Sequence, residues 1–292
     1  MKSSNILVLG GNGMLGHVLS RVLKEETDYN IFITARNSKN LSLKKIIDNK
    51  NIIHNLDVSK IESVEKIIKK IKPFLVVNCI GAIKQLKDSI DVSSYIYLNS
   101  LFPHLLYEIC NSTNSRLIQI STDCVFSGEK GNYTEKDNSD CKDLYGRSKF
   151  LGEIIDKENV LTLRTSIIGH EVHKKISLLE WFLSQKNECF GYENAIFSGL
   201  PTVTLSRVIK NYILKDESIY GLYHLSSHPI SKLNLLKKIS KIYNKKISIV
   251  SKKELKIDRS LDSSMFIKKT GYEIPSWDLL IEEMHKFNNK SF

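Results

Sequence analysis

The chain has 292 residues, of which 41% are hydrophobic and 26% are charged, and its formal net charge is +11. These values are typical of a soluble globular protein, and no apolar run approaches the roughly 20 residues needed to cross a bilayer, so we expect no membrane-spanning segment. Five scattered cysteines without a Cys-x-x-Cys pair argue against disulfides and favour a cytoplasmic location. The basic surplus indicates either solvated helix faces or attraction to an anionic ligand; it is too dispersed to predict nucleic-acid binding.

Short apolar runs alternate with helical patterns through the first half of the chain. Strands are predicted over residues 6–9, 31–34, 51–54, 75–78, 117–120 and 160–163, and helices over residues 14–26, 58–72, 98–110 and 144–157. Such alternation predicts an α/β fold with a Rossmann-type, doubly wound parallel sheet. Ligands of such a sheet bind at the carboxyl ends of its strands.

After about residue 166 the rhythm changes. Helical patterns cover residues 176–184, 203–214, 231–243 and 277–287, with short strands such as 247–250 between them. We therefore predict a dinucleotide-binding Rossmann domain over residues 1–165 and a smaller α+β, mainly substrate-binding lobe over residues 166–292. The boundary is soft and leaves room for one later strand to return to the main sheet.

A glycine-rich turn follows the first predicted strand and opens the first helix. Gly10, Gly13 and Gly16 have the spacing that permits a tight turn, close approach of the backbone to a pyrophosphate, and close helix–strand packing. The amides of this turn and the helix dipole would hold the phosphates, so the predicted cofactor contacts include Asn12, Met14 and Leu15. The alternative is a glycine turn without a ligand.

The residues after the second and third strands indicate which dinucleotide binds. Thr34-Ala35-Arg36 offers no carboxylate for a ribose 2′-hydroxyl, whereas Arg36 suits the 2′-phosphate of NADP. Arg36 could equally be an ordinary surface residue. Asp57 could accept a hydrogen bond from the adenine amine, with Val58 beneath the ring, or it could cap a helix that begins near Val58.

The segment from Tyr145 to Lys149 places a phenol and an ammonium four residues apart, on one face of a helix. Hydride delivery to a ketone leaves an alkoxide that needs a proton, and Tyr145 can supply one. We expect the Lys149 ammonium to lower the pKa of Tyr145 and to hold the nicotinamide ribose. Thr122 would orient the carbonyl, with Ser121 as the second choice. Taken alone, Tyr145 could be a packed helix aromatic.

Together these motifs resemble the extended short-chain dehydrogenase/reductase superfamily, and within it the dTDP-4-dehydrorhamnose reductase family. The resemblance extends from Asn5 to about Asp262. Its matching segments are residues 10–16, 56–58, 77–81, 99, 121–128, 145–149, 152–153, 163–166, 199–202 and 258–262. It implies the fold described above, a nicotinamide cofactor, and reduction of the C4 ketone of a nucleotide-activated 6-deoxyhexose by Thr122, Tyr145 and Lys149.

The resemblance also implies roles for residues outside the triad. Asn99 matches the family's helix-kinking asparagine, although it could instead bond its own helix. Arg164 and Arg259 could bind the diphosphate of the sugar nucleotide, or could be structural. The remaining implied contacts are Cys79 and Gly81 to the cofactor, and Lys84, Asp123, Val125 and Phe126 to the substrate.

Departures from the family pattern limit the assignment of a substrate. Cys124 stands where an aromatic residue is common and Ser127 where Asp is common, and the segment 81–85 also differs. These changes leave room for dTDP- or UDP-linked sugars, including acetamido sugars. Cys124 also removes the second carboxylate that a 4,6-dehydratase needs.

We therefore predict an NADPH-dependent reductase of surface polysaccharide synthesis. An epimerase that retains its cofactor, or a non-catalytic cofactor-binding regulatory subunit, is the alternative. A homodimer is compatible with the sequence, and the histidine spacing predicts no metal site.

Overall fold

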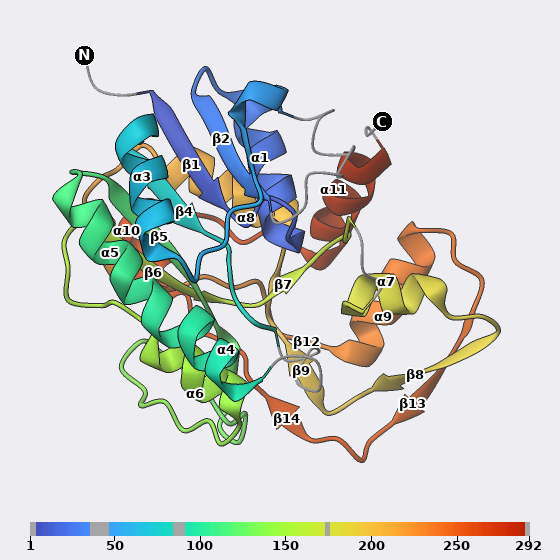
Figure 1. The fold of residues 1–292 in the computed structure, drawn as a ribbon. Coiled ribbons are helices and arrows are strands. Elements are labelled where there is room, and N and C mark those ends of the chain that lie inside the picture. The colour runs from blue at the N-terminus through green and yellow to red at the C-terminus, as the bar shows by residue number, and fades with distance from the viewer. Residues whose placement is uncertain (1–3, 36–46, 84–90, 173–175, 290–292) are drawn as a thin grey trace.

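The computed structural model describes residues 4–35, 47–83, 91–172 and 176–289. Its central feature is a seven-stranded parallel sheet in the order β11-β6-β5-β4-β1-β2-β3 (Figure 1). The strands of this sheet are β1 (Asn5–Leu9), β2 (Asn30–Ala35), β3 (Ile52–His54), β4 (Leu75–Asn78), β5 (Arg116–Thr122), β6 (Val160–Thr165) and β11 (Gly221–His224). This confirms the predicted Rossmann-type α/β class and adds a seventh strand from the second half of the chain.

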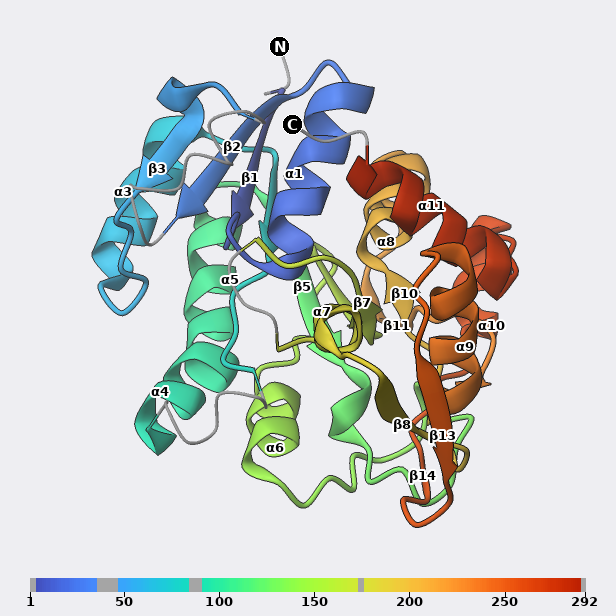
Figure 2. The same ribbon diagram turned by 90° about the vertical axis from the view of Figure 1, so that its right-hand side faces the viewer.

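Helices cover both faces of the sheet because successive strand residues point to opposite sides. Ile6 and Val8 of β1 join one apolar cluster, whereas Leu7 and Leu9 join another. Figure 2 shows α1 (Met14–Glu26), α8 (Thr202–Val208) and α11 (Trp277–Asn289) on one side. On the other side lie α3 (Ile61–Ile71) and α5 (Phe102–Ser112). The apolar runs within these strands follow from burial on both faces.

The remaining elements surround the carboxyl ends of the strands. The helices are α4 (Val92–Ile96), α6 (Leu144–Leu151), α7 (Leu178–Ser184), α9 (Lys232–Ile242) and α10 (Ser264–Thr270). The strands are β7 (Ile167–Ile168), β8 (Glu188–Tyr192), β9 (Ala195–Phe197), β10 (Leu200–Pro201), β12 (Ile230–Ser231), β13 (Ser248–Lys252) and β14 (Ile257–Asp258). They form three small sheets, β10-β7, β12-β9-β14 and β13-β8. Short 3₁₀ turns occupy η1 (Asn49–Asn51) and η4 (Asp123–Val125), and π-helical turns occupy η3 (Tyr97–Leu101) and η5 (Ile209–Ile213).

The second half of the chain is interleaved with the first. Strand β11 pairs in parallel with β6 and extends the main sheet, which is the returning strand that the sequence left open. Helix α8 packs against α1. The sequence pattern changes at the predicted division near residue 165, and elements from both sides of that division pack together.

One predicted helix is too long. The pattern predicts a helix over residues 144–157, but α6 ends at Leu151 with Gly152 as its C-cap. A Cβ atom at position 152 would lie 1.9 Å from the carbonyl oxygen of Asn99. Close packing against η3 thus requires glycine there and ends the helix, and the chain turns so that Glu153 enters the interior.

Candidate active site

The glycine turn lies after β1, where the strand order reverses between β1 and β4. Gly10 has φ of +83° and donates its N–H to the hydroxyl of Thr34 at 3.0 Å. A Cβ at position 16 would lie 2.2 Å from the carbonyl oxygen of Gly10. Gly13 is exposed at the N-cap of α1 and has no side chain to cover the first-turn amides. This geometry fits a pyrophosphate at the helix N-terminus.

The rest of the turn surrounds this cradle. Asn12 and Met14 are half-buried, whereas Leu15 points into the core at 4% exposure. A contact of Leu15 with a cofactor would therefore have to come from its backbone. The cofactor contacts of all six residues predicted in this turn stay predictions, and the geometry of the turn is compatible with them.

Asp57 and Val58 lie at the carboxyl end of β3, as expected, but Asp57 does not cap a helix at Val58. Its carboxylate accepts hydrogen bonds from the N–H and hydroxyl of Ser59, at 3.0 and 2.7 Å. The following helix has Lys60 as its N-cap. Asp57 is exposed, so its proposed contact with adenine stays a prediction. Arg36, on which the preference for NADP depends, lies outside the described residues.

Thr122 and Tyr145 meet because α6 is seated directly on the turn that follows β5. Asp143 caps α6 by accepting a hydrogen bond from the N–H of Gly146 at 3.0 Å. A Cβ at position 146 would lie 2.2 Å from the carbonyl oxygen of Cys124, so no larger residue fits. The phenol of Tyr145 is thereby brought close to the hydroxyl of Thr122, which itself donates a hydrogen bond to the carboxylate of Asp123 at 3.1 Å.

Burial raises the pKa of Tyr145 above its usual value, the neighbouring Cys124 and Asp123 raise it further, and the nearby hydroxyl of Thr122 acts in the opposite direction. The sequence-based expectation of a lowered pKa is therefore wrong for the net shift, because desolvation of the phenolate outweighs the influences that lower the pKa. The consequence suits a reduction. Tyr145 stays protonated at neutral pH and is available as a proton donor.

Lys149 lies one helical turn beyond Tyr145 and is only 6% exposed. Its ammonium donates a hydrogen bond to the carbonyl oxygen of Ile120 at 2.6 Å. Burial lowers the pKa of Lys149 to about 8, and the negative charge of Glu153 acts in the opposite direction. Lys149 is thus a buried cation that loses its proton just above neutral pH.

Asn99 holds the loop after β4 against α6. Its side chain donates to the carbonyl oxygen of Ala82 at 3.1 Å and to the hydroxyl of Ser148 at 3.0 Å, and it accepts from the N–H of Ala82 at 2.9 Å. The alternative that it bonds its own helix is therefore wrong. It does lie in a π-helical turn, as expected of a helix-kinking residue.

The loop fixed by Asn99 carries two predicted cofactor contacts. Cys79 donates its N–H to Leu9 at the end of β1, at 3.1 Å. A Cβ at position 81 would lie 4.0 Å from the ammonium of Lys149. The structure therefore brings Gly10, Cys79, Gly81 and Lys149 around one space at the carboxyl ends of β1 and β4.

Two predicted substrate contacts have buried side chains, so a contact with a substrate would have to come from their backbone. Val125 and Phe126 are completely buried and join Tyr133 and Leu261 in a small apolar core. The Phe126 ring stacks on Tyr133 with 4.1 Å between ring centroids. This small core fixes the chain that follows Thr122 and Asp123, and the contacts of Val125 and Phe126 with a substrate stay predictions.

Arg164 is also occupied within the protein. Its guanidinium forms a two-pronged ion pair with Glu153 at 2.9 and 2.7 Å, and the two side chains are 4% and 3% exposed. It also lies over the ring of Phe126, 5.1 Å from the centroid. This arrangement supports the structural alternative and not a contact with a diphosphate.

Arg259 stays a candidate for the diphosphate. It is half-buried and donates a hydrogen bond to the carbonyl oxygen of Phe126 at 2.7 Å. Burial raises the pKa of Asp123, and the positive charge of Arg259 opposes that rise. Arg259 and Asp123 are therefore neighbours at the rim of the catalytic cluster. Lys84 lies outside the described residues.

Sequence reasoning missed one residue of the cluster. Glu153 accepts a hydrogen bond from the hydroxyl of Ser121 at 2.6 Å in addition to its pairing with Arg164. The spacing of four from Lys149 is the signal that could have identified it. Ser121, the second choice for orienting the substrate carbonyl, is directed to Glu153, whereas Thr122 faces Tyr145.

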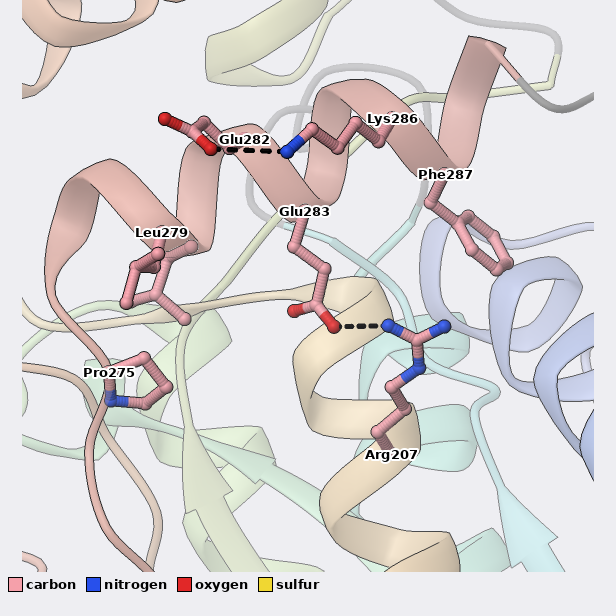
Figure 3. A pocket seen from close by; sticks show the side chains of 8 residues that line it. Arg207, Pro275, Leu279, Glu282, Glu283, Lys286 and Phe287 are labelled. Atoms are coloured by element: carbon pink, nitrogen blue, oxygen red, sulfur yellow. Dashed lines mark hydrogen bonds and ion pairs between the residues drawn. The ribbon is translucent and has the colours of Figure 1, made fainter.

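A pocket of about 510 Å³ lies elsewhere, between α8 and α11. Figure 3 shows it with the ion pair between Arg207 and Glu283, and it contains none of the predicted site residues. The candidate site is instead the place where the side chains of Thr122, Tyr145 and Lys149 converge. Within the described ranges, no group of three or more His, Cys, Asp or Glu side chains is arranged to hold a metal ion. No helix in that part of the chain is long and apolar enough to span a bilayer.

Comparison with known proteins shows the family of this chain. The family model described as the RmlD substrate binding domain matches residues 4–287. A dTDP-4-dehydrorhamnose reductase of Aggregatibacter actinomycetemcomitans is 25% identical over 235 residues, covering 77% of this chain and 74% of its own. The methionine adenosyltransferase 2 subunit beta of Danio rerio is 27% identical over 236 residues, covering 76% and 68%.

A solved structure shares the whole fold. The dTDP-4-dehydrorhamnose reductase of Bacillus anthracis, in complex with NADP, superposes with a TM-score of 0.79 at 21% identity, covering 98% of this chain and 100% of the other. The fold and the family model define an extended short-chain dehydrogenase/reductase, a class of NAD(P)-dependent oxidoreductases. Within that class, the chain belongs to the RmlD substrate binding domain family.

Proposed function

We propose that this protein uses NADPH to reduce the C4 ketone of a nucleotide-activated 4-keto-6-deoxyhexose, for the synthesis of a surface polysaccharide. The single observation that carries the proposal is the contact between Tyr145 and Thr122 beside the buried Lys149, at the carboxyl end of the sheet that carries the glycine turn. The names of the reductases from Aggregatibacter actinomycetemcomitans and Bacillus anthracis support it. Conversion in the cytoplasm fits the five cysteines, all of which are present as thiols.

The reaction divides between cofactor and protein. A bound nicotinamide supplies the hydride that forms the new C–H bond at C4. Thr122 donates a hydrogen bond to the ketone oxygen, and Tyr145 transfers its proton to that oxygen as the alcohol forms. The ammonium of Lys149 then stabilises the phenolate until a proton returns from water.

The choice of NADPH over NADH depends on Arg36 together with the absence of a carboxylate from the sequence of β2. On the substrate side, Arg259 provides a cation for the diphosphate beside Asp123, with the second half of the chain forming most of the remaining pocket. We retain the homodimer as a prediction, to be tested by light scattering coupled to gel filtration.

A cofactor-binding regulatory subunit is the second candidate, favoured by the likeness to the methionine adenosyltransferase 2 subunit beta. The convergence of Thr122, Tyr145 and Lys149 argues against it, since a purely binding role needs no proton donor. An epimerase that retains its cofactor would use the same three residues. It would consume no NADPH.

The test is NADPH oxidation with a panel of dTDP- and UDP-linked 4-keto-6-deoxysugars, with NADH in parallel. We expect turnover with at least one of them, and a fall of about 10²- to 10⁴-fold in Tyr145→Phe, which lacks the proton donor but keeps the ring. NADPH binding should be unchanged in that variant. Equal turnover by Tyr145→Phe would contradict the proposal, and stoichiometric binding to another enzyme without turnover would favour the regulatory role.

A further inference from the structure

The buried carboxylate of Glu153 stands where three structural elements of the site meet. It follows α6, which carries Tyr145 and Lys149. It accepts the Ser121 hydroxyl of β5 at 2.6 Å and receives two N–H groups of Arg164 from β6 at 2.9 and 2.7 Å. Ser121 and Arg164 are direct neighbours in the β5–β6 register. The strand pairing therefore places both partners in front of one carboxylate.

The same elements hold the catalytic side chains. Ser121 immediately precedes Thr122, and Ile120, whose carbonyl oxygen accepts the Lys149 ammonium at 2.6 Å, immediately precedes Ser121. A shift of Ser121 would therefore move the residues on both of its sides. With a side chain only 3% exposed, Glu153 has no solvent to replace a lost partner.

We propose that Glu153 is a positioning residue of the reductase, which sets the end of β5 and keeps the Lys149 ammonium in place by its negative charge. The inference rests on the proposed function, because that function assigns Thr122 and Lys149 their tasks. Glu153 does not contact the reacting atoms. It acts through Ser121 and Lys149, and Arg164 holds it in the orientation that allows both.

Charged and titratable groups from the neighbouring elements influence the pKa of Lys149 and the pairing of Glu153. Lys149 is influenced by Glu153 and by the thiol of Cys79 after β4. Glu153 is paired with Arg164, and Arg164 in turn contacts the ring of His224 on β11 at 3.3 Å. Burial lowers the pKa of Lys149 to about 8, and Glu153 is the strongest opposing influence. Loss of the Glu153 charge should therefore make Lys149 lose its proton at a lower pH.

The test compares the pH profile of turnover in the wild type, Glu153→Gln, Glu153→Asp and Arg164→Met. In the wild type, turnover should fall as the pH rises through about 8. In Glu153→Gln the fall should begin about one pH unit lower, with kcat reduced more than KM is raised. Glu153→Asp keeps the charge, so its turnover should fall at the same pH as that of the wild type. Arg164→Met disturbs the same buried pair but keeps the carboxylate beside Lys149, so its turnover should not begin to fall at a lower pH.

A second readout does not depend on the sugar substrate. Because the pKa of folded Lys149 lies below its unfolded value near 10.4, the unfolded state binds more protons between these two values. The unfolding free energy should rise with pH across that window, and Lys149→Met should lack this rise. In Glu153→Gln the rise should begin at lower pH.

The outcomes separate the two claims. A lower onset of that rise in Glu153→Gln, without turnover on any sugar, would support the positioning role and contradict the proposed reduction. The positioning role would be overturned if, in Glu153→Gln, the unfolding free energy began to rise at the same pH as in the wild type and turnover also fell at the same pH. An equal downward shift in Arg164→Met would overturn it as well, since general loosening of the buried pair would then explain both variants.

Discussion

Two clusters of ion pairs join separate elements of this fold, and they differ chiefly in burial. Arg164 and Glu153, beside the catalytic residues, have side chains only 4% and 3% exposed. Arg207 on α8 pairs with Glu283 of α11 (Figure 3). It also pairs with Glu26 of α1, and its side chain is 37% exposed. The second cluster exchanges its partners for water at small cost, whereas the first cannot. The same residue types thus position neighbouring groups in the buried cluster, whereas in the exposed cluster they contribute weakly to the packing of helices.

The largest effect is expected from breaking the buried pair on one side. Arg164→Met leaves the charge of Glu153 uncompensated in the interior, which should lower the unfolding free energy by about 3–5 kcal/mol. Urea unfolding measures this value. The double variant Glu153→Leu/Arg164→Met removes both charges and should recover much of the loss. A single variant as stable as the wild type would show that the pair is hydrated and the contrast in burial unimportant.

His224 belongs to the same buried cluster and should make the unfolding free energy depend on pH in the acidic range. Its side chain is fully buried, and burial, followed by the charge of Arg164, lowers its pKa from 6.5 to about 4. Between these values the unfolded state binds the proton and the folded state does not. The unfolding free energy should therefore decrease as the pH falls from 6.5 to about 4, by about 3 kcal/mol in total.

Denaturant unfolding at a series of pH values checks this expectation. His224→Asn should flatten the slope between pH 6.5 and 4, whereas the matched substitution of an exposed histidine, His104→Asn, should leave it unchanged. An identical slope in all three proteins would show that other groups cause the acid sensitivity.

The smallest effect is expected at the half-exposed cluster. Arg207→Met removes the pairing with Glu26 and Glu283, yet solvent screens both carboxylates, and the unfolding free energy should fall by no more than about 1 kcal/mol. Added salt should reduce the difference from the wild type further. A loss as large as that of Arg164→Met would refute the claim that burial distinguishes the two clusters.

The first half of the fold could be predicted from the sequence because its signals are local. Each buried parallel strand is a short apolar run, and the glycines at positions 10, 13 and 16 have a steric reason that the structure displays. The strands of the second half are as short as two residues, as in β7, β10, β12 and β14. Such bridges depend on tertiary contacts and leave no periodic pattern.

The site shows the same limit. Spacing alone indicated that Tyr145 and Lys149 share a helical face. Whether an arginine faces a ligand or the core cannot be read from spacing, because it depends on which strand lies next to it. Arg164 is paired with Glu153 through the β5–β6 register and the early end of α6 at Gly152, and both are consequences of packing. The rise in the pKa of Tyr145 likewise reflects burial, which the sequence does not display.

The central claim is that Thr122, Tyr145 and Lys149 convert a sugar-nucleotide ketone into an alcohol by hydride transfer. The most direct measurement uses NADPH in which deuterium replaces both hydrogens at C4 of the nicotinamide ring, followed by magnetic resonance of the sugar product. The account predicts deuterium on C4 of the sugar, one equivalent for each NADPH oxidised, with the label transfer slowed strongly in Tyr145→Phe. Tight binding of NADPH with no label in any of the 4-keto-6-deoxysugars offered would contradict it.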